Sequence, residues 1–419
     1  MRALFRDRYA RNFAIRFWDG SVVPAAGSAN FTLEIRHPGA LRTAFKPPAD
    51  LNTGRAFAAG LIDVHGDMES AVGEMLQAFK QSTPSMLVRI ALLLHRLPAA
   101  PLPRLREANL KGKRHSVQRD RAAIGFHYDQ PVAFYQSFLD REMVYSCAYF
   151  DDGISDLAQA QRAKIDYSLR KLRLRPGERL LDIGCGWGAL VVRAAQQFGA
   201  HVLGVTLSEV QLEEARRRIA QANVQDRANV ELWDYRELPA TAFDKVVSIG
   251  MFEHVGRARM PQYFNTVFGL LRSGGLFLNH GIATEEVSSD GKAAGFMDRL
   301  IFPDGELLPI SDALQVAQRS GFEIRDLENL REHYMRTLRA WVANLERNRQ
   351  RAVFAAGEQA YRAWRLYLAG SAQGFRSARM ALFQTLLAKR REDGSVEIPA
   401  TRRDLYSQRT VRAELVTLR

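Results

Sequence analysis

The string LLDIGCGWGAL at residues 180–190 limits the fold of this chain more than any other feature. Apolar residues suited to a buried strand lead to Asp182, and glycines then stand at alternate positions, Gly184, Gly186 and Gly188. Apolar residues at helical spacing follow in the string LVVRAA. This order predicts a strand, a glycine turn and the start of a helix, where backbone N–H groups can bind a ligand that lies close to the chain.

The spacing of these glycines, G-x-G-x-G, differs from the G-x-G-x-x-G of dinucleotide-binding folds. The shorter form, with an acidic residue on the strand before it, resembles the S-adenosylmethionine (SAM) turn of Rossmann-like methyltransferases. A plain tight turn is the alternative interpretation of the glycines alone. The sequence downstream favours the binding site.

Strands and helices alternate from about residue 160 to 285. The patterns predict strands at 179–183, 201–206, 230–233, 243–249 and 276–280, and helices at 189–198, 209–221 and 260–271. Such a rhythm predicts an α/β fold of the Rossmann-like type, with a mostly parallel, doubly wound sheet and helical insertions. A ligand is then expected at the carboxyl ends of the strands.

The chain has 419 residues, which is enough for two domains. Within residues 1–115, strand patterns at 13–18 and 31–35 and helical patterns at 68–79 and 86–97 predict a smaller α+β domain. The basic string KGKRHSVQRDR at 111–121 predicts a linker or a mobile arm. We expect the larger domain to span 116–419, with a mostly helical region from about 325 to 390.

The net charge of +13 favours polyanionic partners, either nucleic acid or an anionic phospholipid surface. Charge does not choose between them, and an arginine-rich surface without such a partner is a third interpretation. Cys147 and Cys185, the only cysteines, exclude a disulfide framework and a cysteine zinc site. No apolar run reaches the length of a membrane span, and the N-terminus lacks the apolar core of a secretory signal. We therefore expect a cytoplasmic protein.

Polar residues follow the predicted strands where a ligand would lie. Strand two ends in GVTLSEVQ, which offers Thr206, Ser208 and Gln211 for ribose hydroxyls. Strand three ends in the string WDYR, placed for an adenine ring, and strand four leads to Glu253 at the reactive end, with His254 beside it. Upstream, the rings of Phe134, Tyr135 and Phe138 are interpreted as packing, whereas the string YSCAY at 145–149 is interpreted as part of a site.

The chain resembles the cyclopropane-fatty-acid synthases, a family that includes the bacterial phospholipid enzymes and the mycolic-acid cyclopropane synthases and methyltransferases. The matching strings stand in the family's order over about residues 125–390: YDQPVAFYQSFLDREMVYSCAYF, LLDIGCGWGAL, GVTLSEVQ, VVSIGMFEHVG, LNHGI, FMDRLIFPDGELLP and YMRTLRAW. The strings DGSVVPA and ADLNTGRAFAAGLIDVHGDME also resemble the lipid-facing N-terminal domain of the phospholipid enzymes.

The resemblance implies a SAM-dependent C-methyltransferase that converts the cis double bond of phospholipid acyl chains into a cyclopropane, through a carbocation deprotonated by bound bicarbonate. It implies peripheral association with the inner face of the membrane, a possible homodimer and no nucleic acid. The implied catalytic residues are Cys147, Glu253, His280, Ile282 and Tyr334. The implied cofactor-binding residues are Tyr145, Ser146, Asp182, Gly184, Gly186, Trp187, Gly188, Thr206, Leu207, Ser208, Gln211, Asp234, Tyr235 and Arg236.

One position departs from the family. Several members carry a cysteine in the C-terminal helical region, where this chain has Ser371. The product is therefore left open between a cyclopropane and a methyl-branched or methylene acyl chain. A lipid-binding protein without catalysis is a weaker alternative. An RNA methyltransferase is disfavoured, because the expected base-stacking pocket with a proline-rich or cysteine catalytic motif is not found in the sequence.

Overall fold

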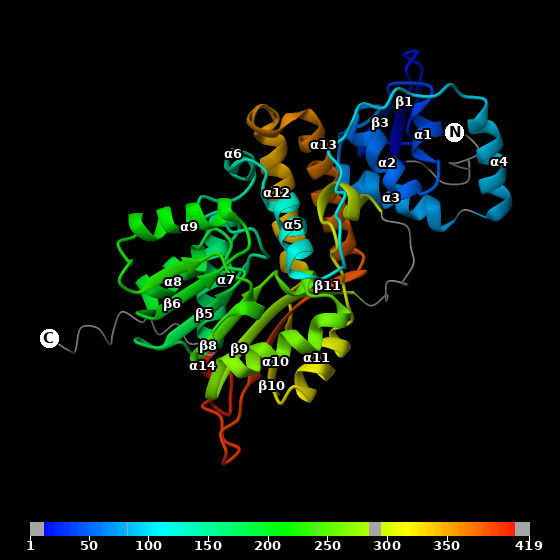
Figure 1. Ribbon diagram of the computed structural model, residues 1–419. Coiled ribbons are helices and arrows are strands. Elements are labelled where there is room, and N and C mark those ends of the chain that lie inside the picture. The colour runs from blue at the N-terminus through cyan, green and yellow to red at the C-terminus, as the bar shows by residue number, and fades with distance from the viewer. Residues whose placement is uncertain (1–11, 82, 240, 285–294, 407–419) are drawn as a thin grey trace.

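The computed structural model describes residues 12–81, 83–239, 241–284 and 295–406, which form two sheets joined through a long C-terminal helix (Figure 1). The expectation that no secretory signal is present concerns mostly residues 1–11, which lie outside the described part. Among the described residues, no helix is long and apolar enough to cross a membrane.

The larger sheet has seven strands in the order β10-β11-β9-β8-β5-β6-β7. The strands are β5 (Arg179–Ile183), β6 (His201–Val205), β7 (Ala228–Glu231), β8 (Phe243–Ile249), β9 (Leu271–Thr284), β10 (Glu323–Asn329) and β11 (Met380–Ala388). The five strands from β5 to β9 run parallel, and β11 lies antiparallel to both of its neighbours. The prediction of a mostly parallel α/β sheet is confirmed.

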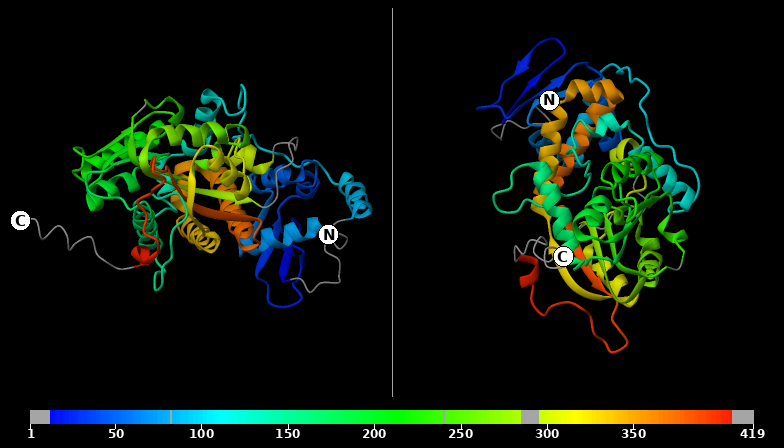
Figure 2. Two further views of the ribbon diagram at one scale, coloured as in Figure 1. Left: turned by 90° about the horizontal axis from the view of Figure 1, so that it is seen from below. Right: turned by 90° about the vertical axis from the view of Figure 1, so that its left-hand side faces the viewer.

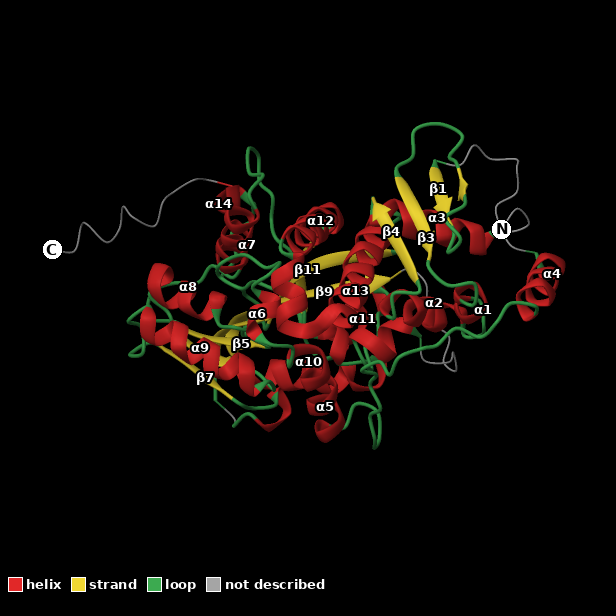
Figure 3. Cartoon of the chain, turned by 90° about the horizontal axis from the view of Figure 1, so that it is seen from above, coloured by secondary structure: helices red, strands yellow, loops and turns green. Residues whose placement is uncertain are grey.

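Helices cover both faces of this sheet (Figure 3). One apolar cluster joins the sheet to α7 (Leu157–Lys171), α8 (Ala189–Phe198) and α9 (Glu209–Gln221), and the other joins it to α10 (Met260–Leu270) and α11 (Ile310–Arg319). Alternate side chains of β5 enter opposite clusters, since Leu180 belongs to the first and Leu181 to the second. The sheet is therefore doubly wound, as predicted.

The N-terminal unit is built on a four-stranded sheet in the order β2-β1-β3-β4. Its strands are β1 (Phe13–Arg16), β2 (Val22–Val23), β3 (Phe31–Ile35) and β4 (Ile62–Gly66), and its helices are α1 (Ala40–Ala44), α2 (Ala49–Ala58), α3 (Met68–Lys80) and α4 (Pro84–His95). The predicted strands and helices are present. The sequence patterns missed β4, whose last residues, His65 and Gly66, were interpreted only as a turn.

The remaining described helices lie between or after the strands of the two sheets. They are α5 (Val117–Tyr128), α6 (Val132–Tyr135), η1 (Tyr235–Glu237), η2 (Phe252–His254), η3 (Arg257–Arg259), η4 (Met297–Ile301), α12 (Arg331–Arg347), α13 (Arg349–Arg376) and α14 (Arg403–Tyr406). Both views in Figure 2 place the blue N-terminal unit beside the orange helix α13 and away from the green strands of the larger sheet.

Two buried arginines of α13 attach the N-terminal unit. Arg362 donates hydrogen bonds to the carbonyl oxygens of Phe57 (2.7 Å) and Ile62 (2.6 Å), and Arg365 donates to the carbonyl oxygen of Val64 (2.9 Å). Apolar side chains of α13 also enter the core of the N-terminal sheet. The two sheets are thus joined through buried polar and apolar contacts, not only through the connecting chain.

One expectation about local structure was wrong, and a second was incomplete. Residues 111–121 are not wholly a linker, because α5 begins at Val117 and Arg119 forms a bidentate ion pair with Asp304 at 2.6 and 2.8 Å. The region from about 325 to 390 is mostly helical, as expected, because α12 and α13 span most of it, but it also contains β10 and β11. The apolar run of β11 reads MALFQTLLA; a buried strand of this composition lacks polar alternation and resembles a helix in sequence.

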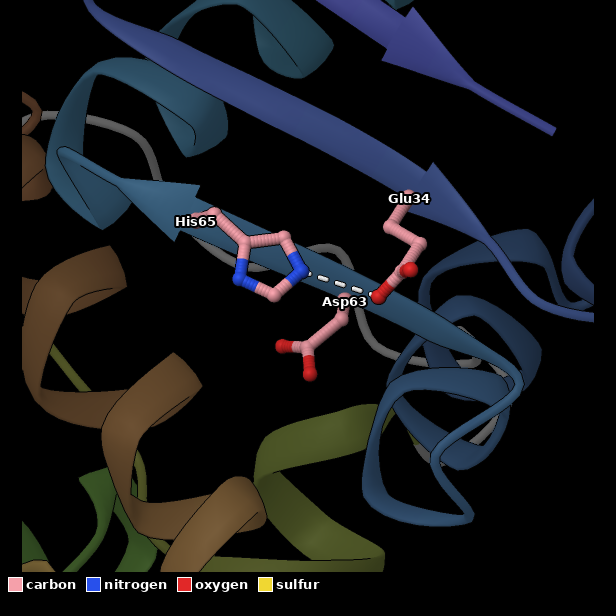
Figure 4. A group of neighbouring side chains, drawn as sticks. All are labelled: Glu34, Asp63 and His65. Carbon is pink, nitrogen blue, oxygen red and sulfur yellow. Dashed lines mark hydrogen bonds and ion pairs between the residues drawn. The ribbon is translucent and has the colours of Figure 1, made fainter. Parts of the chain in front are cut away.

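Glu34, Asp63 and His65 form a surface group on β3 and β4 whose ligand-type atoms lie within 4.8 Å of one another (Figure 4). His65 Nε2 lies 2.8 Å from a Glu34 carboxylate oxygen. The guanidinium of Arg36 contacts Glu34 at 2.8 Å and Asp63 at 2.6 Å, and Arg362 contacts Asp63 at 2.9 Å. Because guanidinium groups already neutralise both carboxylates, this group is an ion-pair network that joins β3 and β4 to α13.

Candidate active site

The glycine turn after β5 has the backbone that its sequence requires. Gly184, Gly186 and Gly188 have φ values of +79°, +55° and +81°, in the left-handed region that favours glycine. Gly188 is the N-cap of α8. A Cβ added to Gly186 would have no atom within 4 Å, so this position opens onto free space. The turn therefore brings bare backbone to the edge of a cavity.

This cavity lies at the carboxyl ends of the parallel strands, as predicted. Twelve of the predicted cofactor-binding residues line it: Tyr145, Ser146, Asp182, Gly184, Gly186, Trp187, Thr206, Leu207, Gln211, Asp234, Tyr235 and Arg236. Gly188 and Ser208 do not line it. Both start helices instead, since Gly188 precedes α8 and the hydroxyl of Ser208 accepts a hydrogen bond from the backbone N–H of Gln211 (3.3 Å).

Buried polar groups form one wall of the cavity. Asp182 is 2% exposed, and burial raises the pKa of its carboxyl to about 7. Lys164, also 2% exposed, comes from α7 and donates from Nζ to the hydroxyl of Ser146 at 2.8 Å; burial lowers its pKa to about 8. Lys164 could not be predicted from the sequence, because a lysine in an amphipathic helix is usually on the surface.

The ends of β6 and β7 supply ordered polar side chains. Thr206 donates from its hydroxyl to the side-chain oxygen of Gln211 at 2.7 Å. Arg236 forms a bidentate pair with Asp234 at 2.8 and 2.6 Å and contacts Asp120 at 2.9 Å. Asp120 belongs to α5, which also contributes Ile124 and Tyr128 to the cavity wall. Sequence reasoning missed these α5 positions, in part because it assigned 111–121 to a linker.

Glu253 lies in η2, next to this cavity but outside its lining residues. Its Oε1 accepts a hydrogen bond from the backbone N–H of Ile282 on β9 at 2.8 Å. Its Oε2 is buried and has no hydrogen-bond partner among the described residues. Burial raises the pKa of Glu253 to about 7. The carboxyl group can therefore exchange a proton near neutral pH and can accept a hydrogen bond from a guest.

Of the other predicted catalytic residues, His280 and Cys147 are buried, whereas Ile282 and Tyr334 are half-buried. His280 on β9 is 1% exposed, and its Nδ1 lies 3.0 Å from the side-chain nitrogen of Gln384. The thiol of Cys147 donates to the carbonyl oxygen of Ala148 at 3.2 Å, and burial raises its pKa. Burial raises the phenol pKa of Tyr334, and the nearby Tyr367, Glu253 and Cys147 add to this effect. The structure thus gathers Glu253, Ile282, Cys147 and Tyr334 at one end of the sheet.

Aromatic rings form a continuous cluster between the cavity and the C-terminal helices. Tyr145 packs on Trp341 with ring centroids 5.1 Å apart and on Trp364 at 6.0 Å, and its hydroxyl lies 3.1 Å from that of Tyr367. Tyr128 continues the cluster and lies 6.3 Å from Trp187 of the glycine turn. The cluster also includes Tyr334 and Trp341 of α12 and Trp364, Tyr367 and Phe375 of α13. The interior beside the cavity is therefore lined by aromatic faces.

The rings interpreted as packing from the sequence are packing residues. Phe134, Tyr135 and Phe138 are each 0% exposed in the central apolar cluster. His254, expected beside Glu253, stacks on Phe302 with ring centroids 4.3 Å apart, and burial lowers its pKa to about 3. His254 is therefore a neutral ring at physiological pH.

The raised pKa of Glu253 predicts a pH-dependent cost to the ligand-free fold. The pKa of this carboxyl group is 4.5 in the unfolded chain and about 7 in the folded one. Burying the ionised carboxylate therefore destabilises the folded protein by an amount that is absent below pH 4.5 and grows until about pH 7. We expect Glu253→Gln to be more stable than the wild type at pH 8, by up to about 3 kcal/mol, and equally stable at pH 4.5. Urea unfolding at both pH values measures this; an equal difference at both would contradict it.

Comparisons with known proteins agree with this geometry. The family described as "Mycolic acid cyclopropane synthetase" matches residues 115–385. A "Probable fatty acid methyltransferase" of Pseudomonas putida is 38% identical over 94% of this chain and 95% of its own length.

Two solved structures cover a smaller share of the chain. Cyclopropane synthase MmaA2 of Mycobacterium tuberculosis is 33% identical, with a TM-score of 0.61 over 64% of this chain and 98% of its own. Mycolic acid cyclopropane synthase CmaA1, complexed with SAH and CTAB, is 34% identical, with the same TM-score and the same coverage.

Proposed function

Since the chain belongs to the mycolic acid cyclopropane synthetase family, we propose that it is a SAM-dependent C-methyltransferase of lipid acyl chains. Its substrate is the cis double bond of unsaturated acyl chains in membrane phospholipids, and its product is a cyclopropane. The observation that carries the proposal is the juxtaposition of a glycine-turn cavity, a packed aromatic cluster and the buried carboxyl of Glu253.

The cavity suits SAM because Gly186 has no side chain: a Cβ there would project into the open space of the cavity, so the cofactor can lie against the backbone. The relative CmaA1 was solved with SAH, the product that SAM leaves after methyl transfer. We assign Asp182, Thr206 and Gln211 to the polar groups of the cofactor and Trp187 to its reactive end. When bound, SAM supplies an electrophilic methyl group.

An isolated alkene is a weak nucleophile, so the chemistry depends on the surroundings of the reacting carbons. The electron pair of the double bond forms a bond to the methyl carbon, the carbon–sulfur bond breaks, and a carbocation is left on the acyl chain. Loss of a proton from the added methyl then closes the ring. The rings of Tyr145, Trp364 and Tyr367 exclude water, and such π-faces stabilise a desolvated cation by up to about 2 kcal/mol each.

Two buried polar atoms support an acid–base guest beside this cluster. Glu253 Oε2 and His280 Nε2 have no hydrogen-bond partner in the described part of the chain. The Glu253 oxygen can accept a hydrogen bond and a protonated His280 Nε2 can donate one, and this combination suits a bicarbonate ion. A bound bicarbonate would supply a base; Glu253 would accept its O–H, while His280 and Tyr334 would donate to its oxygens. The backbone N–H of Ile282 already donates to Glu253 and orients that carboxyl group.

The N-terminal unit supports a phospholipid substrate. The fatty acid methyltransferase of Pseudomonas putida matches nearly the whole chain, whereas MmaA2 and CmaA1 match about two thirds of it. We propose residues 1–115 as a lipid-binding domain and 116–419 as the catalytic domain. The net charge of +13 would favour peripheral binding to an anionic inner membrane face, without nucleic acid, and a homodimer is expected.

Mass spectrometry of lipids tests the proposal. Purified protein is incubated with SAM and vesicles that contain a monounsaturated phospholipid. We expect acyl chains to gain one CH₂ unit, and chemical derivatisation separates a ring from a methylene or methyl-branched chain. No mass gain despite SAM binding would contradict the phospholipid substrate, and no SAM binding in a titration would favour a lipid-binding protein without catalysis.

A different product is the second candidate, and Ser371 is the observation that favours it. Ser371 lies half-buried on α13, the helix that carries Trp364 and Tyr367. We expect Ser371→Cys to keep turnover within about threefold, since the exchange nearly conserves volume. A shifted ratio of ring to methylene product would show that this position directs the fate of the cation; a loss of turnover would contradict its tolerance.

A further inference from the structure

The side-chain amide of Gln384, on β11, has an orientation that its neighbours determine. Its Oε1 accepts a hydrogen bond from Lys171 Nζ at 2.8 Å, and Lys171 also pairs with Glu328. Its Nε2 donates to the hydroxyl oxygen of Ser168 at 3.2 Å and lies 3.0 Å from His280 Nδ1. An ammonium group only donates, so the oxygen of the amide, and not its NH₂ group, must face Lys171.

The protons of this network can be counted. The hydroxyl of Ser168 donates to the carbonyl oxygen of Lys164 at 2.8 Å, so only its lone pairs remain for Gln384. One N–H of Gln384 is directed to Ser168, and the other to His280 Nδ1. Nδ1 is therefore an acceptor and carries no proton. A neutral imidazole has one N–H, which must be at Nε2.

The ring of His280 is neutral, because burial lowers its pKa well below the usual value and the charges of Lys164 and Lys171 add to this effect. Its Nε2 is buried and has no hydrogen-bond partner among the residues that the structure describes. A buried N–H without a partner is rare unless it serves a bound group. The residue is therefore placed to donate at Nε2.

We propose that Gln384, anchored by Lys171, is a positioning residue that holds His280 as the neutral Nε2–H tautomer. In this form Nε2 is a hydrogen-bond donor toward the reacting groups and is not available as a base. Glu253, whose free Oε2 can only accept when ionised, has the complementary role. The claim that Nε2 donates to the reacting groups rests on the proposed function, whereas the claim that His280 is the Nε2–H tautomer does not depend on it.

The tautomer can be measured without lipid or SAM. In protein labelled with ¹⁵N-histidine, long-range ¹H–¹⁵N correlation spectra distinguish a protonated ring nitrogen from an unprotonated one, and His280→Asn identifies the signals of His280. We expect protonation at Nε2 alone. Protonation at Nδ1, or averaging of the two nitrogens by exchange, would overturn the proposal while leaving the proposed function untouched.

Gln384→Glu tests the connection to turnover. A carboxylate accepts from Lys171 and also from His280, so it draws a proton to Nδ1. We expect that proton in the spectrum, together with a loss of turnover of roughly 100-fold and a SAM dissociation constant within threefold of the wild type. Ser168→Ala is the matched control, because it removes the hydroxyl that accepts a hydrogen bond from the Gln384 amide and leaves the contact between Gln384 and His280. The Nε2–H tautomer of His280 and the turnover should both be unchanged.

The outcomes separate the two claims. Loss of turnover in Gln384→Glu with Nε2 still the only protonated nitrogen would show a merely structural role and overturn the proposal. A wild type that shows the Nε2–H tautomer but modifies no acyl lipid would sustain the inference about the tautomer and refute the proposed function. If Gln384→Glu does not fold, the spectrum of the wild type still decides the tautomer.

Discussion

Glu253→Gln is expected to reduce turnover by roughly 10²–10⁴-fold, the range for loss of a group that handles a proton in the rate-limiting step. Glutamine preserves the shape of the side chain. Its oxygen can still accept a hydrogen bond from the backbone N–H of Ile282, which donates to Glu253 Oε1 at 2.8 Å in the wild type. It presents an NH₂ group where Oε2 stands, so it cannot accept the O–H of a guest. SAM affinity should stay within about threefold, because Glu253 lies outside the lining of the cofactor cavity.

The measurement combines single-turnover lipid methylation with a SAM titration of the same preparation. Glu306→Gln is the matched control, since its backbone N–H donates to the Glu253 carbonyl oxygen while its carboxylate faces the backbone N–H of Arg257. The control should keep turnover. Turnover of Glu253→Gln near that of the wild type would refute the role assigned to this carboxyl group.

Gly186→Val is expected to weaken SAM binding by at least about 100-fold, through two effects that act together. A β-branched residue at a φ of +55° is strained. Its methyl groups would also project into the open space that a Cβ at Gly186 would enter, at the edge of the cavity. Both effects remove the close approach between backbone and cofactor on which the glycine turn depends.

Gly177→Val is the control that separates the effect of backbone strain from the effect of a side chain that blocks the cavity. Gly177 lies in an exposed turn before β5, has a φ of +78°, and likewise has no atom within 4 Å of an added Cβ, but it does not line the cavity. The Gly177→Val protein should have a lower thermal stability than the wild type and the same SAM affinity. Calorimetric titration and thermal unfolding of both variants provide the comparison. A folded Gly186→Val protein that binds SAM like the wild type would show that the glycine turn is not the cofactor site.

Local sequence signals were sufficient for the glycine turn and the strand ends that line the cavity. The bounds of α8 and α9 and of strands β5 and β8 match those predicted, because glycines, helix caps and apolar runs mark their ends within a few residues. Asp182 and Thr206 line one cavity, as predicted from the tendency of ligands to bind at the carboxyl ends of parallel strands.

The rest of the site depends on contacts between distant segments, which no local pattern encodes. His280 meets Gln384 only because β9 and β11 pair side by side, and β11 was interpreted as part of a helical region. Asp120 reaches Arg236 across more than a hundred residues of sequence. Lys164 is buried because α7 covers the sheet just beside Ser146. In each case a tertiary contact overrides what composition suggests.

The attachment of the N-terminal unit has a consequence for how sequences of this family can be sorted. Arg362 and Arg365 are buried because backbone carbonyl oxygens of the N-terminal unit receive their N–H groups. In a chain without that unit, these carbonyl acceptors would be absent, and the N–H groups of both arginines that they receive would face water. Because burying unpaired N–H groups is costly, the arginine pair is expected to occur together with the N-terminal unit, so that a catalytic-domain sequence alone indicates whether its chain carries that unit.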